Sequence, residues 1–167
     1  KRRFGLTSSM ADSMSVAVES ADMSHLVATD ELSPETILEL RRTVHCSVER
    51  RSKTDQVAAD FTDVAKKFTS ENKAEVRRGV VLWLLGRVEE AVKILEPVRG
   101  SKERSFVLGL SYLDLGRAQE ALTLLKEAQE AESDSAPIRL GVLEAKIKAG
   151  MDEEAEKLIG QMAKKFE

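Results

Sequence analysis

The sequence has little of several residues on which many folds depend. Its 167 residues include one cysteine, Cys46, so no disulfide can form within the chain and the fold does not depend on oxidation. Aromatic residues make up 4% of the chain and there are 3 prolines. Ala, Leu, Glu, Lys and Arg are frequent in the second half, which favours helices over strands. This composition predicts an all-α fold. It leaves the compartment open, with the cytoplasm favoured.

Long hydrophobic runs and a strong charge imbalance are also missing. No stretch approaches the roughly 20 apolar residues that a membrane span needs, so we expect a soluble protein without a membrane span. The net charge is −3 and both signs are spread over the chain, so no nucleic acid is expected as a partner. The chain begins at Lys1 rather than Met, which favours a fragment or processed form of a longer protein.

Residues that carry chemistry are sparse. The two histidines, His25 and His45, do not combine with Cys46 into a zinc-ligand spacing. No nucleophile elbow and no phosphate-binding glycine loop is present. We therefore expect no catalytic residues, no metal site and no cofactor, and predict that the chain is not an enzyme.

What the sequence does have is a turn that occurs three times. Leu85-Gly86-Arg87, Leu115-Gly116-Arg117 and Ala149-Gly150-Met151 each end an apolar stretch, and an alanine follows each glycine five residues later. Those alanines are Ala91, Ala121 and Ala155. A helical hairpin repeated at about 34 residues predicts an array of stacked hairpins. The expected helices are 73–85 with 88–99, 103–115 with 118–131, and 136–149 with 152–166.

The first 71 residues are less regular. Met10, Met14 and Val18 suggest a helix over residues 8–28, within an N-terminal segment that we place at 1–32. Ser33 and Pro34 form a helix start signal, which predicts a helix from Pro34 to about Arg50. A second helix begins at Thr54 or Asp55, with an apolar stripe that ends at Phe68. Residues 33–71 are thus predicted to form a hairpin that is either a cap or a degenerate repeat.

Positions 72–167 resemble three consecutive units of the tetratricopeptide repeat (TPR) family. Gly79 and Gly109 match the small residue midway along the first helix of a unit, whereas the third unit has Leu143 there. Ala91, Ala121 and Ala155 match the second small position. The resemblance implies a TPR-like α-α superhelix with additional N-terminal helices.

The resemblance also implies a binding site. TPR arrays use the first helices of their hairpins to line a concave groove that holds an extended peptide or a helix. Carried over by position, the groove residues are Val76, Val80, Trp83, Phe106, Leu110, Leu113, Asp114, Leu140, Glu144, Ile147 and Lys148. The set is mainly apolar, and Val80, Leu110 and Glu144 stand where some family members have the asparagines of a carboxylate clamp. An apolar groove of this kind predicts an amphipathic helix as occupant.

Two questions stay open at this point. The groove can be filled by a partner or by the chain's own N-terminal helices, for which residues 8–28 are the natural candidate. The function that we favour is a non-catalytic adaptor or assembly domain that binds a protein or peptide. The alternatives are a regulatory or substrate-presenting module of a larger enzyme, and a domain that self-associates into a homo-oligomer.

Overall fold

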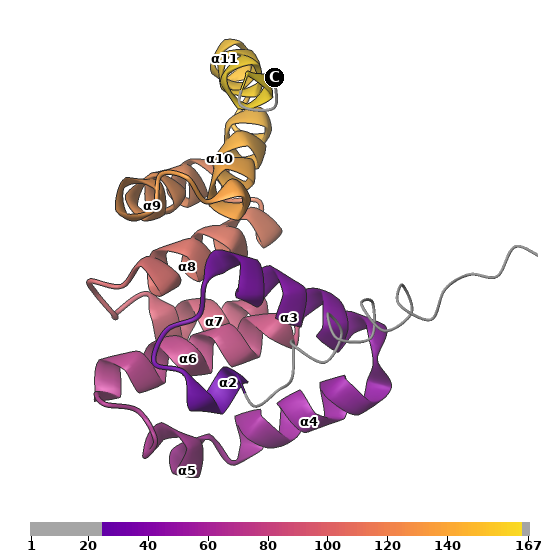
Figure 1. Ribbon diagram of the computed structural model, residues 1–167, viewed down its shortest axis with the longest axis vertical. Coiled ribbons are helices and arrows are strands. Elements are labelled where there is room, and N and C mark those ends of the chain that lie inside the picture. Colours follow the sequence, from indigo (N-terminus) through magenta and orange to yellow (C-terminus); the bar gives the residue numbers. More distant parts are fainter. Residues whose placement is uncertain (1–24, 165–167) are drawn as a thin grey trace, which may run out of the picture.

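The computed structural model describes residues 25–164, and within that range every regular element is a helix. This confirms the all-α prediction. Three hairpins form the second half: α6 (Glu71–Leu84) with α7 (Val88–Leu95), α8 (Lys102–Asp114) with α9 (Ala118–Ala131), and α10 (Ala136–Lys148) with α11 (Asp152–Ala163). The first half contributes α2 (His25–Ala28), α3 (Pro34–Cys46), α4 (Val48–Ala59) and α5 (Phe61–Ala65). Figure 1 shows the hairpins following one another towards the C-terminus.

The repeated turns form as predicted. Gly86, Gly116 and Gly150 have φ of 80°, 75° and 71°, a left-handed conformation that glycine adopts without a Cβ penalty. In each turn the N–H after the glycine bonds back to a carbonyl of the preceding helix, as in Arg87 N to Leu82 O at 2.9 Å. This pattern closes the helix end and lets the next helix start at once. The second helices therefore pack back onto the first.

The small residues allow close crossings within the hairpins. Ala91, Ala121 and Ala155 are buried. A Cβ added at Gly79 would lie 2.4 Å from Leu95, and one added at Gly109 would lie 2.7 Å from Leu125. Leu95 and Leu125 thus occupy the space that a side chain on the facing helix would need. The helix α7 ends at Leu95, four residues earlier than predicted: Glu96 still has helical backbone angles, but Pro97 has no backbone N–H with which to continue the helical hydrogen bonds.

The N-terminal helices differ from the prediction. The helix from Pro34 ends at Cys46, where Ser47 turns to an extended conformation (φ −135°, ψ 119°) and caps α4 by accepting a hydrogen bond from Arg50 N. Val48, expected on the apolar face of one long helix, is 89% exposed as a result. The apolar stripe that ends at Phe68 is divided between α4, α5 and the following turn. Of the expected helix 8–28, the part before residue 25 lies outside the described residues.

The first helices of the three hairpins form one continuous face, which we call the inner face: α6 contacts α8, and α8 contacts α10. The helix α3 contacts both α6 and α10, so it lies across this face, as Figure 1 shows. The helices α4 and α5 pack against α6 at the N-terminal edge of the array. The core is continuous from Leu26 and α3 through all three hairpins.

Candidate protein-binding surface

The predicted groove residues divide into a covered group and an open group. Five of them on α6 and α8 are buried, with side chains at most 3% exposed: Val76, Val80, Trp83, Phe106 and Leu113. The segment from Leu26 to Cys46 lies against the helices that carry them. In this conformation they belong to the core and are not on the surface. Leu110 is half-buried, and Asp114 is exposed.

The centre of α3 is fixed by a three-residue contact. The Arg41 guanidinium lies 3.8 Å from the centre of the Trp83 ring and donates a hydrogen bond to Asp114 Oδ2 at 2.9 Å. The indole N–H of Trp83 donates to the same oxygen at 2.9 Å. Stacking and ion pairing on one carboxylate hold the arginine in place. Ile37, Leu40 and Val44 of α3 are buried beside it.

A buried ion pair fixes the chain just before α3. Arg77 Nε is 3.1 Å from Glu103 Oε1, and both side chains are at most 3% exposed. Glu103 also accepts a hydrogen bond from Leu32 N at 3.0 Å, and Arg77 donates to the Leu26 carbonyl at 2.7 Å. Burial raises the pKa of Glu103 above its ordinary value, although Arg77 and the Leu32 N–H act in the opposite direction. The pair thus connects α6 and α8 to the backbone that crosses them.

The start of α3 reaches the third hairpin. The hydroxyl of Ser135, the residue before α10, donates a hydrogen bond to Glu35 Oε1 at 3.0 Å. These residues are 100 positions apart in the sequence. Because α3 contacts α10 at the N-terminal end of α10, the later turns of α10 lie beyond this contact.

Those later turns carry the open group of predicted residues. Leu140 and Ile147 are each 53% exposed. Glu144 and Lys148 are exposed on the same helix and form an ion pair at 2.7 Å. Leu140, Glu144 and Ile147 share one face of α10 because they are three to four residues apart. Among the predicted groove residues, the apolar side chains that are exposed therefore lie on the third hairpin.

One of the two open possibilities was filling by the chain's own N-terminal helices, with residues 8–28 as the natural candidate. Among the described residues, the cover consists of α3 and the residues from Leu26 to Leu32, whereas positions 8–24 lie outside the described residues. A signal was present: Ile37, Leu40 and Val44 follow the spacing of an amphipathic helix, and Arg41 lies among them. What the spacing could not reveal is which surface the apolar side of that helix meets.

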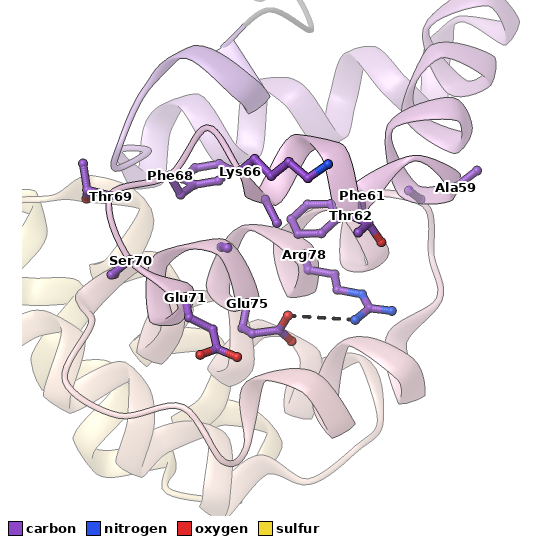
Figure 2. Close-up of a pocket in the computed structure, with 13 residues that line it drawn as sticks. Ala59, Phe61, Thr62, Lys66, Phe68, Thr69, Ser70, Glu71, Glu75 and Arg78 are labelled. Atoms are coloured by element: carbon purple, nitrogen blue, oxygen red, sulfur yellow. Dashed lines mark ion pairs between the residues drawn. The ribbon is translucent and has the colours of Figure 1, made fainter.

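A separate cleft lies at the N-terminal edge, between α4, α5 and α6. It has a volume of about 600 Å³. Figure 2 shows Phe61 and Phe68 on one side and Glu71, Glu75 and Arg78 on the other, with the Arg78 guanidinium 3.9 Å from Glu75. Positive and negative side chains are balanced in its lining, and histidine and cysteine do not contribute to it.

Residues 25–164 contain no group of three or more His, Cys, Asp or Glu side chains placed to hold a metal ion. Within the same range, no helix combines the length and the apolar character that crossing a bilayer requires. Cys46 is exposed at the end of α3.

Comparisons with known proteins agree with the architecture. Residues 112–166 match the family model described as Tetratricopeptide repeat. Among solved structures, the chain is similar to a tetratricopeptide repeat protein from Parabacteroides merdae, with 18% sequence identity and a TM-score of 0.58. The alignment covers 93% of this chain and 61% of that one, so the present chain spans less than two thirds of the similar protein. A search of the curated proteins finds no match.

The family match begins near the end of α8 and covers α9, α10 and α11, and the structural likeness extends over nearly the whole chain. Both agree with the repeated turns, the buried alanines and the close glycine crossings described above. TPR folds are generally protein–protein interaction modules, which implies protein partners for such chains. Residues 112–166 therefore match the tetratricopeptide repeat family, and the described residues form an all-α helical-repeat fold that is similar to a known tetratricopeptide repeat protein.

Proposed function

We propose that this chain is a non-catalytic adaptor or assembly module and that it binds a peptide or amphipathic helix on the open part of its inner face. The observation that carries the proposal is the change in burial along that face. The apolar side chains of α6 and α8 are covered by the segment from Leu26 to Cys46, which includes α3, while Leu140 and Ile147 of α10 are half exposed. Apolar side chains that remain accessible next to a covered, apolar surface are typical of interaction sites.

The spacing of these residues fits a helical partner. Leu140 and Ile147 are seven residues apart, with Leu143 half-buried between them. An amphipathic helix offers apolar residues at matching intervals. The helix α3 supports this choice of partner, because it already rests on the same face through Ile37, Leu40 and Val44. A partner helix would lie beside α3, along α10.

Polar groups at the edge of the open area would orient the partner. Glu144 and Lys148 flank Ile147, and Asp114 is 33% exposed where it accepts from Arg41. Exposed charges of this kind affect specificity and association rate more than affinity. The non-catalytic part of the proposal rests on the family, whose repeats generally serve for interaction.

The test is quantitative affinity capture of partners from cells that express the protein. A variant with Leu140→Asp and Ile147→Asp is compared with wild type and with a control that carries Val48→Asp and Ile159→Asp. All four positions are exposed, so circular dichroism should report the same helix content for each protein. We expect at least one partner that wild type and control recover equally and that the α10 variant loses. Equal recovery of every partner by all three proteins would contradict the assignment of this surface.

The same variants test self-association. Light scattering over a range of concentrations measures the mass of each protein. If wild type forms a concentration-dependent dimer that the α10 variant does not form, the occupant of the open area is a second copy, and the adaptor proposal is replaced by the oligomerisation alternative.

A further inference from the structure

A second cleft lies on the other side of α10, between α9 and α11. We call it the α9–α11 cleft. It has a volume of about 320 Å³ and is lined by Lys126, Gln129, Val142, Lys146, Glu154, Lys157, Leu158 and Gln161. Val142 and Lys146 are on the face of α10 opposite to Leu140 and Ile147, because the helix turns about 100° per residue. The cleft is therefore separate from the surface proposed above.

Its charge differs from that of the rest of the chain. Three lysines and one glutamate line it, which gives an excess of positive charge in a protein whose net charge is −3. Lys146 is 9% exposed and forms an ion pair with Glu154. Lys126 and Lys157 are exposed, and neither has an ion-pair partner within residues 25–164. The α9–α11 cleft thus carries two exposed ammonium groups that have no ion-pair partner among the described residues.

The environment of Glu154 agrees with this arrangement. Its pKa is lowered, chiefly by the hydrogen bond from Lys146, and the charges of Lys146, Lys126 and Lys157 act in the same direction. The carboxylate is therefore ionised at neutral pH and offsets one of the three positive charges. Lys126 and Lys157 line the same cleft as Glu154, which is why their charges act on its carboxylate.

The glutamate of this cleft is paired differently from its counterparts in the other repeats. A glutamate follows the turn glycine by four residues in every hairpin: Glu90, Glu120 and Glu154. In the first two hairpins an arginine of the same turn pairs with it, Arg87 with Glu90 and Arg117 with Glu120, both through two hydrogen bonds. In the third hairpin Met151 stands at the arginine position, and Lys146 from α10 takes over the pairing.

We propose that the α9–α11 cleft binds an acidic peptide segment of a partner protein. Aspartate or glutamate side chains of the segment would pair with Lys126 and Lys157, and an apolar side chain would rest on Val142 and Leu158. Gln129 and Gln161 can donate hydrogen bonds to the carbonyl groups of an extended backbone. A nucleic acid fits less well, because the lining has no aromatic side chain on which a base could stack. This proposal does not depend on binding at the inner face.

The probe is a dye-labelled peptide of sequence Glu-Glu-Leu-Glu-Glu with both ends blocked, and its counterpart with glutamine at every glutamate position. Fluorescence anisotropy measures binding to the full chain at low salt. We expect the acidic peptide to bind and the glutamine peptide to bind at least tenfold more weakly. Added salt should weaken the acidic complex, since exposed charges are screened.

The variant with Lys126→Gln and Lys157→Gln identifies the site. We expect it to bind the acidic peptide about tenfold more weakly, which corresponds to two exposed ion pairs of moderate strength. The control carries Lys67→Gln and Lys93→Gln, two exposed lysines in the first half of the structure without an ion-pair partner among the described residues. The control changes the net charge by the same amount and should bind like wild type.

Three results would overturn the proposal. One is the absence of any binding of the acidic peptide to wild type at low salt. A second is equal weakening by the two lysine variants, which would indicate attraction to net charge without a site. The third is tighter binding of a single-stranded oligonucleotide of equal charge, lost in the Lys126 and Lys157 variant, which would assign the cleft to nucleic acid.

Discussion

At the scale of single residues, the glycines within helices show that helix propensity and side-chain packing can favour different residues at the same position. Gly79 and Gly160 both lie within helices, where glycine costs roughly 1 kcal/mol relative to alanine. A Cβ at Gly79 would meet Leu95 at 2.4 Å, whereas a Cβ at Gly160 would meet nothing within 4 Å. The same substitution should therefore have opposite effects at the two positions.

We predict that Gly160→Ala raises the free energy of unfolding by about 0.5–1 kcal/mol through helix propensity. Gly79→Ala should lower it by about 1–3 kcal/mol, because Leu95 is buried and has to move. Urea denaturation followed by circular dichroism measures both changes. Stabilisation by Gly79→Ala would mean that the helices α6 and α7 do not cross as closely as described.

Tyr112 supplies a prediction on pH. It is the one tyrosine of the chain, and its hydroxyl donates to Glu96 Oε1 at 2.7 Å. Burial, together with this carboxylate, raises the pKa of Tyr112 to about 12. The folded protein therefore holds the phenolic proton more tightly than the unfolded chain, in which tyrosine titrates at about 10. The stability due to Tyr112 is complete below pH about 10 and is lost as the pH rises towards 12.

The ultraviolet absorbance of the phenolate measures this titration directly. Glu96→Gln should lower the midpoint, because the hydrogen-bond acceptor loses its charge. A midpoint near the ordinary value of about 10 in folded wild type would show that Tyr112 is not held by Glu96.

At the scale of elements, the segment from Leu26 to Cys46 depends on the pair of Arg77 and Glu103. Glu103→Gln should lower the free energy of unfolding by about 3 kcal/mol, because it replaces the buried carboxylate that pairs with Arg77 by a neutral amide. The amide oxygen of the introduced glutamine would still be able to accept from Leu32 N, so the loss is due mainly to the missing charge of the buried ion pair. Urea denaturation of the variant and of wild type measures the difference.

The double variant with Arg77→Met and Glu103→Gln is the matching control. It removes both charges and should recover a large part of the loss, although the bond from Arg77 to the Leu26 carbonyl is gone. The single variant Arg77→Met completes the cycle, and if the effects of the two single variants simply add in the double variant, the residues do not form a coupled buried pair. The fluorescence of Trp83, the one tryptophan, would report in the same experiment whether α3 leaves the inner face.

The elements also differ in how far the sequence predicted them. The turns at Gly86, Gly116 and Gly150 followed directly from the residues, because a left-handed glycine with an apolar helix on each side has few alternatives. The break at Ser47 did not. Arg50 and Arg51 are good helix formers, so propensity extends the helix past the point where the chain must turn to place α4 against α6. Packing decided that boundary.

At the scale of the whole molecule, the repeats and their resemblance to a known family could be predicted from three short segments, whereas the accessible part of the inner face could not. Position within a repeat indicates that Val80, Leu110 and Ile147 belong to the inner face. It does not indicate that the first is buried, the second half-buried and the third exposed. That difference results from contacts between residues far apart in sequence, such as Arg41 with Asp114.

One of these contacts changes the mechanics of the array. In an open stack of hairpins each unit touches only its neighbours, so the array of hairpins can bend and extend elastically. Here α3 acts as a brace between the first hairpin and the start of the third, through α6 and through Glu35 with Ser135. Such a brace removes the elastic freedom of the first two units and makes them lose structure together. Of the three hairpins, the last ends in α11, which lies past the reach of the brace, and we expect this helix to fray before the first two hairpins lose structure.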